Sequence, residues 1–176
     1  MFDTFGEIGS AEELNTIAEN LVNEGDIESL KALAKENGIE EEYALDFANG
    51  DSEIFVDATM AAEGKLFIEG EALKPKGIMQ DWLSYIEAET FEDEGVAKAV
   101  RKKGKSLKGC IASLMELSFR NREPVDKDIL EMVNLKPKPS RVEFYVPNMR
   151  EAKEAIRKYY MGEKDEKERT SCGASR

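Results

Sequence analysis

The chain has 176 residues, of which 41% are hydrophobic and 35% charged, with a formal net charge of −12 and no histidine. Without imidazole it cannot use a histidine-activated nucleophile or a zinc site that needs histidine, so an enzyme would have to work with carboxylates, lysine or tyrosine. We expect no enzyme, cofactor or metal. No run approaches the roughly 20 apolar residues of a membrane helix, and the start lacks the segments of a signal peptide, so a cytoplasmic protein is expected.

Three short helices are predicted within residues 1–50, and we expect them to form a small acidic bundle. Ser10 and Glu13 have the spacing of a capping box, and the apolar residues behind them recur at helical intervals. Asp26 can cap the second helix, and the third begins shortly afterwards. Glycines that favour a left-handed conformation are expected to end the three helices: Gly25, Gly38 and Gly50.

The second and third helices have the spacing of a helix-turn-helix within residues 30–50. In a DNA reader the second of the pair enters the major groove and needs Lys, Arg, Asn or Gln. Here it carries acidic side chains: Glu40, Glu41, Glu42 and Asp46. Phosphate would repel these carboxylates, which disfavours DNA reading. Two interpretations remain, a solvated acidic face on a packing helix or an acidic docking surface for a basic partner.

Residues 52–73 mix helical and alternating patterns. We expect a helix that is broken or bent near Gly64 and ends before Pro75. A further helix is predicted from Gly77 to Thr90, with Trp82 as a core residue. The acidic cluster that follows lacks the alternating ligands of a calcium loop and fits the solvated start of a helix. Its candidate partner-binding residues are Glu92, Asp93 and Glu94.

The charge changes sign after residue 100. Residues 1–100 carry 25 acidic and 6 basic side chains, whereas residues 101–176 carry 12 acidic and 19 basic ones. The basic residues gather before and at the start of a helix predicted from Ser106 to about Asn121, as possible contacts for nucleic acid or a partner: Arg101, Lys102, Lys103, Lys105 and Lys108. This segment is not a phosphate loop, because Ala99 stands where that loop needs its first glycine. Within the predicted helix, Cys110 is expected in the core.

The last third of the chain alternates helix and extended segments. A helix is predicted over 125–134 with Ile129, Met132 and Val133 facing inward. Residues 141–146 form the strong strand candidate, and Lys65–Ile68 is its plausible partner. A final helix is expected over 148–161, and residues 163–176 are polar enough to be disordered.

Together these patterns predict a mainly α protein. An N-terminal three-helix bundle of helix-turn-helix type occupies residues 1–50. A mostly helical domain, basic from residue 101, follows over 51–162 with at most one short β-hairpin or strand pair. The tail occupies 163–176.

Three stretches together resemble a known class of protein. They are EGDIESLKALAKENGIEEEYALDFANGD (24–51), KGKSLKGCIASLMELS (103–118) and VPNMREAKEAIRKYYMG (146–162). The chain resembles accessory proteins of phages and conjugative elements that include anti-CRISPR inhibitors of type II CRISPR nucleases. The resemblance lies in packing and charge patterns, so it carries over no residue roles. It implies a small, non-enzymatic protein that disables an RNA-guided nuclease by binding it.

Two functions from different classes follow. In the first, the acidic residues face the basic channel in which a type II nuclease holds its guide RNA and DNA. The basic segment then either braces the acidic half or touches guide RNA or DNA. In the second, the chain is a nucleic-acid-binding accessory protein of a mobile element and acts through its basic C-terminal half. Catalysis is disfavoured because carboxylate pairs such as Asp126 and Asp128 are two residues apart and point to different helix faces.

Overall fold

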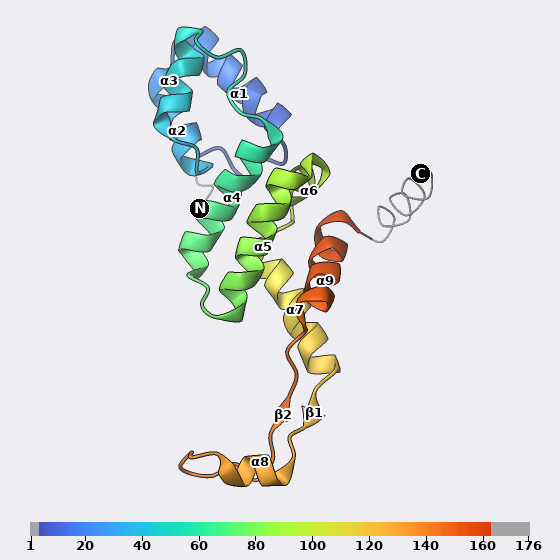
Figure 1. Cartoon of the computed structure of the whole chain (residues 1–176). Coiled ribbons are helices and arrows are strands. Elements are labelled where there is room, and N and C mark those ends of the chain that lie inside the picture. Colours follow the sequence, from blue (N-terminus) through green and yellow to red (C-terminus); the bar gives the residue numbers. More distant parts are fainter. Residues whose placement is uncertain (1–3, 163–176) are drawn as a thin grey trace, which may run out of the picture.

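The structure is a computed structural model that describes residues 4–162. Its N-terminal part contains three consecutive helices (Figure 1). They are α1 (Ala11–Glu24), α2 (Ile27–Glu36) and α3 (Glu41–Asn49). The predicted glycine turns are confirmed, since Gly25, Gly38 and Gly50 all have positive φ angles. The Ser10 hydroxyl oxygen accepts from the Glu13 amide at 3.1 Å, but the Glu13 carboxylate accepts from Gly9 at 2.8 Å. In a capping box the Glu13 carboxylate would accept from the amide of Ser10, whereas here it accepts from the amide of the preceding residue, Gly9.

The middle of the chain folds into α4 (Ala58–Leu73), α5 (Ile78–Glu92) and α6 (Glu94–Arg101). Helices α4 and α5 run in opposite directions side by side, with α6 packed against both (Figure 1). The expected break at Gly64 is wrong, because α4 is assigned as one helix on both sides of it. Lys65 and Glu69 are both buried, and their spacing of one helical turn places them on the same face.

A projecting arm separates α7 (Leu107–Arg120) from α9 (Met149–Met161), which pack against each other (Figure 1). The arm contains β1 (Glu123–Pro124), α8 (Lys127–Met132) and β2 (Glu143–Phe144). The two strands are antiparallel, with Glu123 opposite Phe144. The prediction that residues 65–68 supply the strand partner is therefore wrong, because those residues belong to α4 and a nearer segment pairs instead. The part of the chain described is mainly helical, with one small two-stranded sheet.

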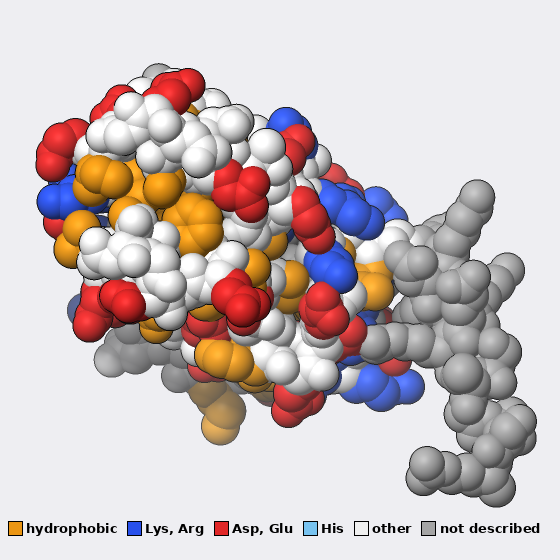
Figure 2. Space-filling model, turned by 90° about the horizontal axis from the view of Figure 1, so that it is seen from above, with side chains coloured by type: hydrophobic (Ala, Val, Ile, Leu, Met, Phe, Trp, Pro, Cys, Tyr) orange, Lys and Arg blue, Asp and Glu red, His pale blue; other side chains and the backbone are white. Residues whose placement is uncertain are grey.

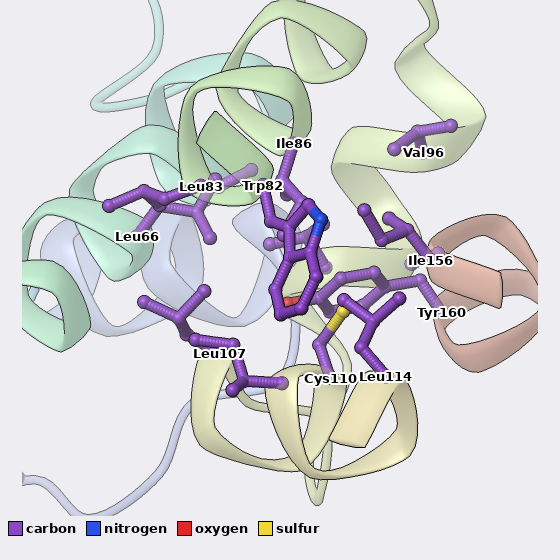
Figure 3. Close-up of a cluster of buried hydrophobic side chains, with 14 of the residues drawn as sticks. Leu66, Trp82, Leu83, Ile86, Val96, Leu107, Cys110, Leu114, Ile156 and Tyr160 are labelled. Atoms are coloured by element: carbon purple, nitrogen blue, oxygen red, sulfur yellow. The ribbon is translucent and has the colours of Figure 1, made fainter. Parts of the chain in front are cut away.

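Two clusters of buried apolar side chains stabilise the body. The larger one joins α4 to α7 and α9, with Trp82 and Cys110 inside it as predicted (Figure 3). The smaller one joins α1, α2 and α3, and it also includes Phe55 and Val56 from the segment that leads into α4 and Ala61 from α4 itself. Helix α4 therefore contributes to both clusters and links the N-terminal helices to the rest of the body.

Several side chains predicted to face inward are exposed instead. Ile129 and Met132 point away from any core, whereas Leu130 between them is buried. The helical pattern of this segment is real, but α8 lies at the far end of the arm, where there is no second layer for its apolar stripe to cover. The expected disorder of residues 163–176 concerns a segment outside the described residues. Among residues 4–162, no helix combines the length and the hydrophobicity needed to cross a membrane.

Candidate protein-interaction groove

A groove lies between the α2–α3 turn and the outer face of α4. We call it the acidic groove. Its lining residues are Gly38, Ile39, Glu40, Tyr43, Met60, Glu63, Gly64 and Phe67. It continues along α2 past Glu28, Lys31 and Lys35, and it is also lined by Glu41 of α3. Two of the eight residues in the first set, Glu40 and Glu63, are carboxylates. Glu40 is the N-cap of α3 and Tyr43 lies in its first turn, so the predicted acidic helix forms one wall of a concave surface.

The base of the groove is a contact between two glycines. Gly38 has a φ of 69°, which favours glycine, and its backbone lies directly against that of Gly64. A Cβ on Gly38 would overlap the Gly64 carbonyl and come within 2.9 Å of its Cα, and a Cβ on Gly64 would overlap the Asn37 carbonyl oxygen. The role of Gly64 is therefore to let the α2–α3 turn approach α4.

A buried polar network fixes the turn from behind. Asn37 is fully buried, and its side-chain amide donates to the Leu33 carbonyl at 2.8 Å. Its side-chain oxygen accepts from Arg101, which also donates to the Ala61 carbonyl at 3.2 Å. Burial lowers the pKa of Arg101 to about 10. One side chain of α6 thus ties the end of α2 to the beginning of α4.

Two aromatic side chains stand at the groove with much of their surface in water. Phe67 is 60% exposed and Tyr43 is 46% exposed, whereas Ile39 beneath them is buried. Exposed aromatic side chains beside a buried apolar floor are the arrangement from which interface anchors are built. The acidic groove therefore offers apolar contact as well as negative charge.

The predicted carboxylates of α3 remain on the surface. Glu40, Glu41 and Glu42 are exposed, and Glu41 pairs with Lys31 at 3.0 Å. Asp46 is half-buried, and its backbone carbonyl accepts the amide of Asp51 in the turn that follows α3. Figure 2, which views the molecule from above, shows hydrophobic side chains lying among acidic ones and some basic ones.

Glu63 adds a further carboxylate that the sequence interpretation missed. Burial raises its pKa, and the nearby charges of Asp57 and Glu87 raise it further. The ionised form of this side chain is therefore less favourable in the folded chain than in water. A positive charge placed beside Glu63 would favour its ionised form.

Two members of the second predicted acidic set, Asp93 and Glu94, make contacts within the chain. Asp93 caps α6 by accepting from the Gly95 amide at 3.0 Å, and Glu94 pairs with Lys98 at 2.8 Å. Arg157 of α9 binds both Asp93 and Glu89, at 3.4 and 2.5 Å. Glu92 is exposed. This set lies at the α5–α6 junction and is not part of the acidic groove.

The basic segment is largely engaged with the body. Arg101 is 1% exposed, which corrects its assignment to a contact surface. Lys103 pairs with Glu13 at 3.1 Å, and the Gly104 amide donates to Glu7 at 3.1 Å. Lys105 donates to the Tyr159 carbonyl. The segment therefore braces the acidic half, one of its two predicted roles, while Lys102 and Lys108 are exposed.

No protein-family model, curated protein or solved structure matches this chain. Its function must therefore be argued from its own residues. Within the described residues 4–162, no group of three or more histidine, cysteine, aspartate or glutamate side chains is placed to hold a metal ion. The acidic groove is the concave surface that combines exposed aromatic rings with the predicted carboxylates.

Proposed function

We propose that this chain is a non-enzymatic anti-CRISPR protein that binds a type II RNA-guided nuclease through the acidic groove and blocks DNA binding or cleavage. The observation that carries the proposal is the position of Phe67 and Tyr43, exposed beside the carboxylates of α3. The resemblance of three stretches to inhibitors of this kind supports it further. Host and location follow from the proposal: the bacterial cytoplasm, with a phage or conjugative element as the source.

Physical complementarity gives the proposal its mechanism. A type II nuclease holds a heteroduplex in a positively charged channel and reads its flanking motif with arginines. Carboxylates at the groove would speed encounter with such a surface and select its orientation. Electrostatic steering contributes more to association rate than to affinity, so the aromatic side chains would supply most of the binding free energy.

In this proposal α1, α2 and α3 act as a three-helix unit of helix-turn-helix type that has exchanged its DNA-reading residues for carboxylates. Helix α3 carries Glu40, Glu41 and Glu42 at the place where a DNA reader would be basic. The unit would thus imitate the charge of nucleic acid. Its packing onto α4 through Gly38 and Gly64 would hold that charge in a fixed position beside Phe67.

A cleavage assay with a purified type II nuclease, its guide RNA and increasing amounts of this chain tests the proposal. Inhibition by the wild type should fall about tenfold or more in Phe67→Ala, because an exposed interface anchor is removed. Phe91→Ala is the matched control, since Phe91 is a 69% exposed phenylalanine on α5 that does not line the groove. Cleavage that continues unchanged at large excess of the wild type would refute the function.

Charge reversal provides a second arm of the same assay. Replacing Glu40, Glu41 and Glu42 by lysine should slow association, and the loss should shrink as salt concentration rises because exposed charges are screened. Inhibition that is lost equally at every salt concentration would contradict an electrostatic role for α3.

A further inference from the structure

The arm, which we define as residues 119–146 and which therefore includes the last two residues of α7, projects from the body with almost no core of its own (Figure 1). Leu130 is the buried apolar side chain within it. The two strands contribute two residues each, and the Val125 amide donates to the Val142 carbonyl at 2.9 Å beside them. An isolated two-stranded ribbon is only marginally stable in water. A surface that covered the arm would therefore stabilise it.

The arm exposes large apolar side chains along its length. Met132 is 86% exposed, the largest such fraction among the large hydrophobic residues described. Four others are more than half exposed: Phe119, Ile129, Leu135 and Phe144. A fully buried aromatic side chain covers about 150–250 Å². Phe119 is 60% and Phe144 is 65% exposed, so these two and the three smaller aliphatic side chains together offer on the order of 500 Å² per copy. That is a large part of the roughly 800 Å² that each partner buries in a standard interface.

The charges of the arm are divided between its two halves. Residues 123–131, on the way out, carry four acidic side chains and one basic one. Residues 136–141, on the way back, carry three basic side chains and no acidic one. Arg141 already pairs with Glu143 of the same arm. Lys138 donates to the Glu131 carbonyl at 2.7 Å, so Lys136 is the basic side chain with the fewest contacts inside the arm. A two-fold axis that crosses the segment near its middle brings each half opposite the other half of its partner, so such an interface needs a self-complementary surface. This segment meets that requirement.

The rest of the chain limits how two copies can meet. The arm has a net charge of +1, so the remaining residues carry −13. Contact between two bodies would bring like charges together, whereas contact between two arms keeps the bodies at a distance. Near-neutral charge, exposed apolar side chains and projection from the body thus coincide in one segment.

We propose that the arm is a homodimer interface, in which two copies of this chain pair their arms about a two-fold axis. The outgoing half of one arm faces the returning half of the other, and the apolar side chains around Met132 are covered between them. This inference is independent of the acidic groove and of its nuclease partner. Its interface is small, so the dimer should be weak and dependent on concentration.

Sedimentation of the full-length chain over a wide concentration range tests the proposal. The wild type should pass from monomer to dimer, and Met132→Ser should weaken dimerisation about tenfold or more. Phe91→Ser, an exposed apolar residue of the body, should dimerise as the wild type does. A wild type that is monomeric throughout, or a Met132→Ser variant that dimerises normally, would overturn the proposal.

A charge-exchange experiment tests the orientation of the two arms. One variant carries Lys136→Glu and Lys138→Glu, and the other carries Asp128→Lys and Glu131→Lys. Each variant alone places like charges opposite each other and should be monomeric, whereas their mixture restores both pairs and should form a heterodimer. Circular dichroism of each variant confirms that the fold is retained. If neither variant loses self-association, or the mixture does not regain it, the proposed pairing is wrong. A wild type that does not dimerise, and whose arm instead binds nucleic acid or the nuclease, would also overturn the homodimer proposal.

Discussion

Substitution of Gly64 by alanine tests the geometry that forms the acidic groove. Gly64 lies inside α4, where alanine would ordinarily stabilise a helix by about 0.5–1 kcal/mol. In this fold the added methyl group would overlap the Asn37 carbonyl oxygen and lie 3.2 Å from the Gly38 carbonyl carbon. These are backbone atoms, so no side-chain rotation can relieve the overlap. The expected effect therefore has the opposite sign to helix propensity.

The size of the loss in unfolding free energy depends on how far the overlapping backbone atoms can move apart. Overpacking a well-packed contact costs about 1–3 kcal/mol, and backbone against backbone belongs at the upper end. After subtraction of the helix propensity gain, we expect Gly64→Ala to lose about 2 kcal/mol of unfolding free energy. For a chain of this length that corresponds to a fall in Tm of about 4–8 °C. Inhibition through the groove should weaken as well, because α3 would move relative to Phe67.

Urea and thermal denaturation followed by circular dichroism provide the assay. Gly70→Ala is the matched control, because Gly70 lies on the same helix and a Cβ there would come within 3.2 Å of a Leu83 side-chain methyl group, which can shift. We expect the control to be as stable as the wild type or slightly more stable. If Gly64→Ala behaved in the same way, the α2–α3 turn could not rest on α4 as described.

Three further predictions concern the buried network and the basic segment. Arg101→Ala should lose about 2–4 kcal/mol in urea denaturation because it leaves buried acceptors without a donor, whereas exposed Lys102→Ala should stay within about 0.5 kcal/mol of the wild type. Burial raises the pKa of Glu69 above its ordinary 4.5, so the folded chain favours the protonated form of this side chain. The unfolding free energy of the wild type relative to that of Glu69→Gln should therefore fall as pH rises above 4.5. A rise would contradict this prediction. Gel shifts should show no tight binding of single- or double-stranded DNA; binding abolished by neutralising Lys102, Lys103 and Lys105 would favour the nucleic-acid accessory function instead.

Local signals in the sequence were sufficient for the body helices. Caps such as Ser10 and Asp26 and left-handed turns such as Gly25 depend on the residues immediately around them, and the structure confirms them. Tertiary placement was not accessible in the same way. Ile129 and Met132 have the spacing of a buried stripe, but the pattern cannot indicate that α8 lies on an arm without a second layer.

In the candidate site, too, exposed charged residues were predictable from local sequence, whereas tertiary contacts were not. The exposed carboxylates of α3 were predicted, because a run of glutamates at a helix start has few other places to lie. Arg101 was grouped with neighbouring lysines by composition, yet its side chain points inward to Asn37. Phe67 was not among the site residues predicted from the sequence. Met60, Gly64 and Phe67 recur at helical intervals along α4, so they lie on one face of the helix. This spacing could have indicated an outward-facing stripe in which the glycine allows another segment to approach closely.

Direct binding of this chain to a purified type II nuclease loaded with guide RNA tests the central claim most directly. Calorimetry with the wild type, Phe67→Ala and Phe91→Ala would measure the contribution of the acidic groove. The account predicts a complex for the wild type and Phe91→Ala, with affinity reduced about tenfold or more in Phe67→Ala. No complex with the wild type, or equal affinity for all three proteins, would contradict it.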